Sequence, residues 1–130
     1  MDHTPQRISV AVVKRDDCVL IGQRPEGVAL AGYWEFPGGK IQDRESPGEA
    51  AQRECLEETG LQVDVTAELA RIQHEYAHGR LELYFFQCAL VADSDGLPSP
   101  PFHWVNLAEL DTYRFPPAND PIIARLLAER

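Results

Sequence analysis

Short apolar runs rich in β-branched residues recur along the chain and predict a protein with many strands. The first two, Arg7–Lys14 (RISVAVVK) and Cys18–Arg24 (CVLIGQR), are separated by Arg15-Asp16-Asp17, a pattern that favours a β-hairpin. The run Leu81–Val91 (LELYFFQCALV) is apolar enough to predict a central strand. Shorter strands are predicted at Trp34–Phe36, at Val63 and Val65, at Glu68–Tyr76 and at Phe102–Val105.

One helix has a readable start and end. Ser46 suits the N-cap, Pro47 suits the first helical position, and Glu49 stands where it completes a capping box. Gly60 is a typical stop. A helix is therefore predicted over Pro47–Thr59.

A second helix is predicted at Asp120–Ala128, with Asp120 as its N-cap and Pro121 at its first position. Its apolar residues form one stripe, which predicts packing against the core; an adaptor surface for a partner is the alternative. The stripe consists of Ile122, Ile123, Leu126 and Leu127.

Glycine, proline and asparagine mark the connections between these elements. Pro25–Tyr33 and Ala92–Pro101 are predicted loops. Pro37-Gly38-Gly39 is predicted to be a tight turn in which glycine permits a positive φ. Further turns are expected at His78-Gly79 and at Leu107–Leu110, the latter capped by Asn106.

Composition bounds the class of protein. With 130 residues, 44% hydrophobic and 25% charged, the chain is expected to form one domain over residues 1–130. No apolar run approaches about 18 residues and the N-terminus lacks an apolar signal core, so a cytoplasmic protein is expected. The net charge of −9 argues against attraction to nucleic-acid polymers or anionic membranes. Cys18, Cys55 and Cys88 lack metal-like spacing and are expected to be free thiols.

Three carboxylates share one face of the first predicted helix. Glu54, Glu57 and Glu58 are spaced by three and one residues, which places them within about one 100° sector. Only Arg53, four residues before Glu57, is spaced to pair with them. Because three adjacent carboxylates repel, this face favours a hard divalent cation, Mg²⁺ before Ca²⁺, with a glycine carbonyl such as that of Gly39 as a further ligand. An exposed acidic helix is the alternative.

The stretch from Gly39 to Leu61 matches the pattern G-x5-E-x7-R-E-U-x-E-E-x-G-U, where U is aliphatic, and resembles the Nudix hydrolase family. One position departs, because Cys55 stands where the pattern has an aliphatic residue; we expect it to be buried like a small hydrophobe. The resemblance implies an α/β fold, an α/β/α sandwich whose mixed sheet is flanked by the metal-binding helix and the C-terminal helix. The matching residues are Gly39, Glu45, Arg53, Glu54, Glu57, Glu58, Gly60 and Leu61.

The resemblance also implies a reaction, in which water attacks phosphorus in a nucleoside diphosphate linked to another group. Divalent metal ions, Mg²⁺ with Mn²⁺ as a substitute, would neutralise the phosphates. The implied ligands are Glu54, Glu57, Glu58 and the Gly39 carbonyl. Arg53 would orient the carboxylates by salt bridges, and Glu45 would support the site without binding metal.

The general base is left open by the sequence. Some relatives use a glutamate of the metal-binding helix, so Glu54 or Glu57 is a candidate. Others use a glutamate on a loop before the last strands, but the end of the corresponding loop here, Leu97–Pro101 (LPSPP), has no carboxylate. His103 is a third candidate, because histidine as a residue type suits proton transfer.

Similarity to the MutT subgroup extends beyond this stretch, through Trp34–Lys40 (WEFPGGK), Arg24 and Phe115–Asp120 (FPPAND). It implies hydrolysis of 8-oxo-dGTP to the monophosphate and pyrophosphate, with Arg24, Phe36 and Asn119 as substrate contacts. An amide both donates and accepts, so Asn119 is suited to read a purine edge; a helix cap is its alternative role.

The sequence leaves other interpretations open. We expect a monomer, and we expect its substrate to be a small nucleoside triphosphate. CTP or another triphosphate, a dinucleoside polyphosphate and ADP-ribose are the competing substrates. A nucleotide-binding module without catalysis is the competing class of protein.

Overall fold

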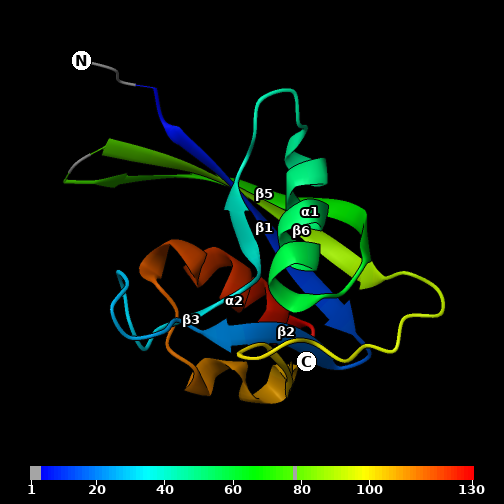
Figure 1. The fold of residues 1–130 in the computed structure, drawn as a ribbon. Helices are drawn as coiled ribbons and strands as arrows, with labels where there is room; N and C mark the ends of the chain where they lie inside the picture. Colours follow the sequence, from blue (N-terminus) through cyan, green and yellow to red (C-terminus); the bar gives the residue numbers. More distant parts are fainter. Residues whose placement is uncertain (1–3, 78) are drawn as a thin grey trace.

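The computed structural model describes residues 4–77 and 79–130. His78, half of one predicted turn, lies outside them. Most elements follow the predicted order (Figure 1). They are β1 (Gln6–Arg15), β2 (Cys18–Gln23), β3 (Trp34–Glu35), β4 (Gly38–Lys40), α1 (Pro47–Thr59), β5 (Val63–Tyr76), β6 (Gly79–Leu90), β7 (His103–Asn106), the 3₁₀ helices η1 (Leu107–Thr112) and η2 (Pro117–Asn119), and α2 (Asp120–Ala128).

Strand β1 organises the mixed sheet. It runs parallel to β6, from the Gln6–Leu81 pair to the Val13–Cys88 pair, and antiparallel to β4 on its other side. Its end forms the predicted hairpin with β2, which in turn pairs with β3 and β7. Strand β6 lies between β1 and β5, so the prediction that this apolar run is a central strand is confirmed.

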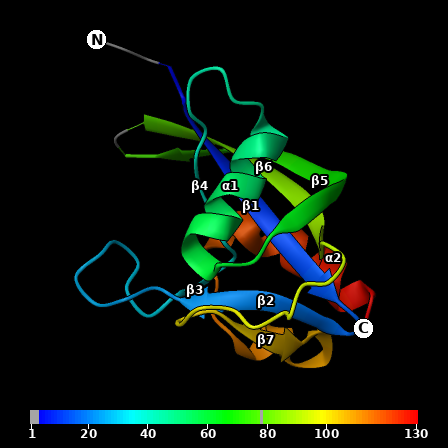
Figure 2. The same ribbon diagram turned by 45° about the vertical axis from the view of Figure 1, so that its right-hand side comes forward.

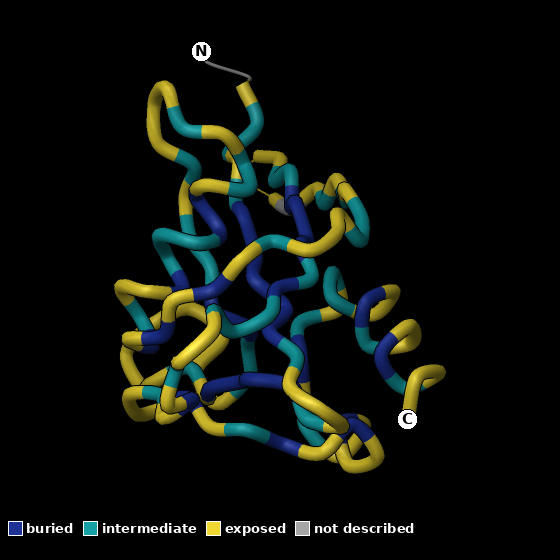
Figure 3. The backbone as a smooth tube through the Cα atoms, turned by 90° about the vertical axis from the view of Figure 1, so that its right-hand side faces the viewer, coloured by how far each residue is buried: buried dark blue, intermediate teal, exposed yellow. Residues whose placement is uncertain are grey.

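Two helices cover opposite faces of this sheet. Alternate residues of β1 enter different cores: Val10 and Val12 pack with α2, whereas Ala11 and Val13 pack with α1. Figure 2 shows the two helices on opposite sides of β1. The buried segments in Figure 3 follow the central strands and the inner sides of the helices. The predicted α/β/α sandwich is confirmed.

Helix α1 has the predicted ends. The Ser46 side chain accepts a hydrogen bond from Glu49 N at 3.1 Å, and the Glu49 carboxylate accepts one from Ser46 N at 2.9 Å. Gly60 ends the helix in the left-handed region at φ 76°. Cys55 is fully buried on the inner side of the helix, as expected of a packing substitution. Cys18, Cys55 and Cys88 are free.

The tight turn predicted at Pro37-Gly38-Gly39 is wrong. Gly38 and Gly39 belong to strand β4, pair with Val10 and Ser9, and do not have positive φ. These positions require glycine because of space. A Cβ on Gly38 would lie 2.5 Å from the carbonyl oxygen of Ser9, and one on Gly39 would collide with the Glu54 carboxylate.

Two other boundaries differ from the predictions. The predicted pair of strands at Val63–Val65 and Glu68–Tyr76 is one strand, β5, which stays paired with β6 through two register shifts. Asp120 is not the N-cap of α2, because η2 runs directly into the helix and Asn119 occupies that position. The predicted cap at Asn106 is confirmed, since its side chain accepts from Ala108 N. Within the described chain, no helix is long and apolar enough to cross a membrane.

Candidate active site

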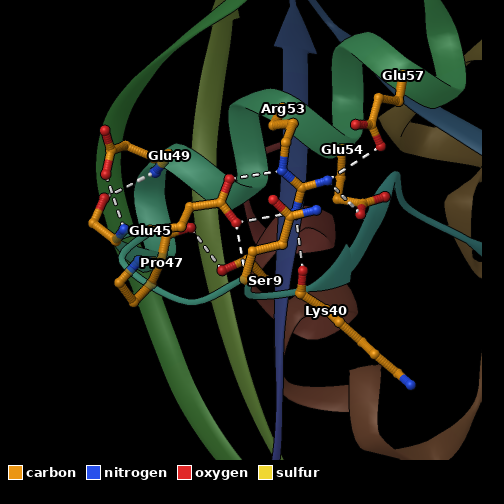
Figure 4. Close-up of polar contacts among 10 residues, drawn as sticks. Ser9, Lys40, Glu45, Pro47, Glu49, Arg53, Glu54 and Glu57 are labelled. Carbon is orange, nitrogen blue, oxygen red and sulfur yellow. Dashed lines mark hydrogen bonds and ion pairs between the residues drawn. The ribbon is translucent and has the colours of Figure 1, made fainter.

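Arg53 is the centre of the carboxylate cluster on α1 (Figure 4). Its Nε donates to Glu45 Oε2 at 2.6 Å, and its Nη1 donates to Glu54 Oε1 at 2.8 Å and to Glu57 Oε2 at 3.1 Å. Its Nη2 donates to Glu45 Oε1 and to the Lys40 carbonyl, each at 3.0 Å. The salt bridges predicted from spacing are therefore present, and they include Glu45 from the preceding loop.

These contacts fix the carboxylates relative to β4. The Glu54 carboxylate lies against the backbone of Gly39. A side chain at position 39 would occupy the space of this carboxylate. Glu45 is positioned by Gln42 N, which donates to its Oε1 at 3.0 Å. Hydrogen bonds from Arg53 hold the pKa of Glu45 below its usual value. The cluster is thus ordered by one guanidinium that links α1, the preceding loop and β4.

Glu58 occupies a different environment from Glu54 and Glu57. Its Oε1 accepts a hydrogen bond from Gly38 N at 2.7 Å. Burial raises its pKa to about 7 against the lowering effect of this bond, and the charges of Glu35, Glu54 and Glu57 raise it further. Negative charge therefore accumulates beside Glu58, although Arg24 and Arg53 pair with the neighbouring carboxylates.

The chemistry of these donors fits a hard divalent cation. Glu54, Glu57 and Glu58 provide carboxylate oxygens on one face of α1, next to the backbone of β4, and oxygen ligands are those that Mg²⁺ prefers. In residues 4–77 and 79–130, no three acidic, histidine or cysteine side chains are already gathered as a metal cluster. Arg53 contacts Oε1 of Glu54 and Oε2 of Glu57, so it orients both carboxylates while each has a second oxygen for a cation.

A pocket of about 750 Å³ opens beside Glu58. Arg24 lies in its wall and donates from Nη1 to Glu35 Oε1 at 3.0 Å and from Nε to the Ala29 carbonyl at 2.8 Å. The structure thus brings Arg24, a predicted substrate contact, to the same pocket as Glu58, a predicted ligand. The lining residues are Gln23, Arg24, Pro25, Glu26, Gly32, Glu35, Glu58, Pro100, Pro101 and Phe102.

Phe36 and Asn119 do not line this pocket. Phe36 is only 4% exposed and stacks on Phe115, with the ring centroids 5.0 Å apart, in the core on the α2 side. Asn119 is half-buried at the start of α2, where its Nδ2 donates to the Pro116 carbonyl at 3.2 Å. Its side chain makes no capping hydrogen bond, so its amide oxygen is not used by the helix.

Sequence reasoning passed over Glu35. The residue stands inside the matched run Trp34–Lys40, between two aromatic residues that pack on the α2 side. Strict alternation along a strand places its side chain on the opposite face, toward Glu58. The sequence signal that could have identified Glu35 as a pocket residue is an acidic residue between two aromatic core residues.

Comparison with known proteins agrees with this geometry. The model of the NUDIX domain matches residues 9–125, so the chain belongs to the Nudix family and is a hydrolase of phosphoanhydride bonds. Members of this family generally use divalent metal ions.

Its relatives include MutT-like proteins, which confirms the predicted resemblance. The chain is 32% identical over 125 residues to the 8-oxo-dGTP diphosphatase of Escherichia coli (strain K12), covering 92% of this chain and 95% of that protein. It is 32% identical over 127 residues to the CTP pyrophosphohydrolase of the same organism, covering 95% and 92%. The solution structure of MutT from methicillin-resistant Staphylococcus aureus 252 matches with a TM-score of 0.78 at 28% identity, covering 99% and 100%.

Proposed function

We propose that the chain is one Nudix domain that acts as a Mg²⁺-dependent nucleoside triphosphate pyrophosphohydrolase, with 8-oxo-dGTP as substrate and 8-oxo-dGMP and pyrophosphate as products. The observation that carries the reaction class is the set of three glutamates on one face of α1 beside β4. Arg53 orders Glu54 and Glu57, and Gly38 N of β4 donates to Glu58. Mn²⁺ is expected to substitute for Mg²⁺.

The residues of α1 would hold the metal. Glu54, Glu57 and Glu58 would provide carboxylate ligands and Gly39 a carbonyl ligand. When bound, the cation neutralises the phosphates and lowers the pKa of coordinated water. Arg53 keeps the carboxylates oriented and Glu45 keeps Arg53 in place, so both act on the reaction through the ligands.

The substrate is proposed from Arg24 and Asn119. Arg24 provides a guanidinium at the pocket, where it can pair with a phosphate. Asn119 retains an amide oxygen that the helix does not use, and its partly exposed side chain can meet a purine edge. Phe36 supports this region by packing on Phe115 from the core rather than by offering a free ring.

CTP is the second candidate substrate. The two relatives from Escherichia coli, one named for 8-oxo-dGTP and one for CTP, are equally identical to this chain at 32%. Overall identity therefore does not distinguish 8-oxo-dGTP from CTP as the substrate. The distinction depends on the residue that would contact the base.

The reaction class is tested by product analysis. Purified protein is incubated with 8-oxo-dGTP in Mg²⁺ and, separately, in EDTA, and the nucleotide and phosphate products are separated. Formation of the monophosphate and pyrophosphate in Mg²⁺ alone is expected. Release of single phosphates, or equal turnover in EDTA, would reject the proposal.

A further inference from the structure

The chain reaches Asn119 through a stretch without regular structure. Residues 113–116, the connecting segment, join η1 to η2 and belong to no helix or strand. Pro116 and Pro117 have no N–H to donate, so two backbone donors are missing at its end. The position of the connecting segment therefore depends largely on the side chains that pack against it.

Strand β3 and the residues beside it provide this packing. Trp34 N donates to the Arg114 carbonyl at 2.8 Å. The Arg114 guanidinium lies over the Tyr33 ring, 4.3 Å from its centroid. Phe36 stacks on Phe115, with the ring centroids 5.0 Å apart. The connecting segment is thus held along its length by one short stretch of chain.

The Trp34 ring holds the start of the connecting segment. It meets the Tyr113 ring edge to face, with centroids 4.8 Å apart and planes at 79°, a favoured geometry for aromatic pairs. It also meets the ring of His103, on β7, at 5.4 Å. The rings of His103 and Tyr113 are 6.5 Å apart, so the three form one cluster. His103, a candidate base from the sequence, is therefore a packing partner of Trp34 in this structure.

The end of the connecting segment orients Asn119. The Pro116 carbonyl accepts from Asn119 N at 3.0 Å and from Asn119 Nδ2 at 3.2 Å. An amide nitrogen carries two hydrogens, so Nδ2 keeps one donor for a base in addition to the oxygen that the helix does not use. Because Pro116 follows Phe115 directly, a displacement of the connecting segment moves the Asn119 amide with it.

The same strand forms part of the pocket wall. Trp34 and Phe36 pack on the α2 side, whereas Glu35 between them lines the pocket and accepts from Arg24 Nη1 at 3.0 Å. One strand thus carries the connecting segment on one face and the pocket wall on the other. The position of Asn119 relative to the pocket is therefore set through β3.

We propose that Trp34 is a positioning residue for base recognition, whose ring holds the connecting segment so that the Asn119 amide meets the purine edge. This inference rests on the proposed function. A hydrogen bond weakens steeply as its geometry departs from the optimum, so a small displacement of the amide reduces discrimination between bases. Trp34 acts through Asn119 and does not itself contact the substrate.

The test compares 8-oxo-dGTP with dGTP in Trp34→Leu. The ratio of their kcat/KM values is expected to fall by about 3- to 10-fold, a part of the roughly 5- to 150-fold that one bidentate base contact provides. For 8-oxo-dGTP, KM is expected to change more than kcat. Both substrates are measured in one preparation, so a smaller folded fraction cancels in the ratio and a loss of stability alone does not change it.

Three further variants define the route. Trp34→Phe keeps an aromatic ring against Tyr113 and is expected to restore most of the ratio. Tyr113→Leu removes the other ring of the pair and is expected to lower the ratio as Trp34→Leu does, which keeps the test decisive if Trp34→Leu does not fold. In an Asn119→Ala background, Trp34→Leu is expected to change the ratio no further, because the residue through which it acts is gone.

Trp104→Leu is the matched control. Trp104 is the other tryptophan of the chain and is also partly buried, but it packs with the core on the α1 side. Its Nε1 donates to the Gly96 carbonyl at 2.8 Å. We expect Trp104→Leu to lower the Tm and to leave the substrate ratio as in the wild type.

Unchanged ratios in Trp34→Leu and Tyr113→Leu would overturn the proposal. An equal fall in Trp104→Leu would overturn it too, because it would indicate general loosening of the fold. A further fall in the Asn119→Ala background would show that Trp34 does not act through Asn119. A wild type without preference for 8-oxo-dGTP over dGTP rejects the proposed substrate and this inference with it, whereas a wild type that has this preference, with unchanged ratios in the variants, rejects only the role of Trp34.

Discussion

Arg53 shows how one residue can order a cluster of carboxylates. It binds three carboxylates and a backbone carbonyl from three different segments of the chain. Its hydrogen bonds, above all those to Glu45, raise its own pKa still further above the usual value. It therefore stays charged at any working pH and joins Glu54 and Glu57 through one nitrogen, Nη1.

Replacing the proposed ligands tests the cluster at the scale of single residues. Glu54→Gln and Glu57→Gln each keep an oxygen that accepts from Arg53 but remove a charged metal ligand. Turnover of 8-oxo-dGTP is expected to fall by on the order of 10²-fold or more, with an unchanged circular dichroism spectrum. Initial rates measure this. Wild-type-like rates in both variants would refute the metal-helix mechanism.

Asn119 tests base recognition. In Asn119→Ala the preference for 8-oxo-dGTP over dGTP is expected to shrink by about 1–3 kcal/mol, the scale of one bidentate base contact. The ratio of kcat/KM values measures it. Asn106→Ala is the matched control: it removes an amide that caps η1 and is expected to cost stability without changing the ratio. An unchanged ratio in Asn119→Ala would leave Asn119 a structural residue.

At the scale of elements, the accuracy of prediction follows the range of the forces involved. Helix α1 was predicted from end to end because its cap, its first proline and its final glycine act within one turn. Strand β4 was mistaken for a turn because its conformation depends on pairing with β1, about 30 residues earlier in the chain. The prediction explained the glycines there by their backbone freedom, whereas the structure requires them because a side chain would not fit.

The same distinction applies to the site. The spacing of Arg53 and Glu57 encodes their contact directly, because residues four apart meet on a helix. Glu35 was missed because its place in the pocket wall, together with Glu58 of α1, depends on which face of β3 its side chain occupies. Phe36 stays a predicted substrate contact, and the core covers its ring in this structure. Only the tertiary packing shows either fact.

Two glycine substitutions test the junction of β4 with α1. In Gly39→Ala the new methyl group collides with the Glu54 carboxylate, so we expect a loss of about 1–3 kcal/mol in unfolding free energy and a marked loss of turnover. Gly48→Ala, in the first turn of α1, meets only Val65 at 3.8 Å and is expected to stabilise by about 0.4–1 kcal/mol. Urea unfolding measures both, and a Gly39→Ala protein as stable and active as wild type contradicts this packing.

At the scale of the whole molecule, the active-site charge opposes folding. The pKa of Glu58 is raised to about 7 from 4.5, so its native form binds the proton more tightly than the unfolded form. Its contribution to stability is present below pH 4.5 and is lost as pH rises through about 7. With a net charge of −9, the metal-free protein gains nothing from added negative charge.

Thermal melts test this linkage. From pH 5 to 8, the Tm of metal-free wild type is expected to fall relative to that of Glu58→Gln, which keeps the bond from Gly38 N but has no proton to lose. Mg²⁺ at pH 8 is expected to raise the Tm of wild type more than that of the variant, because binding to the native state stabilises it. Parallel pH profiles in the two proteins would show that Glu58 ionises normally.

The most direct test of the proposed function is a comparison of substrates. Pyrophosphate or monophosphate release by the wild type with Mg²⁺ would be measured for 8-oxo-dGTP, dGTP, CTP and ADP-ribose at equal low concentration. The proposed roles of Asn119 and the α1 carboxylates predict a strong preference for 8-oxo-dGTP. Faster hydrolysis of CTP or ADP-ribose would contradict the proposed substrate, and no hydrolysis of any of the four would contradict catalysis by this site.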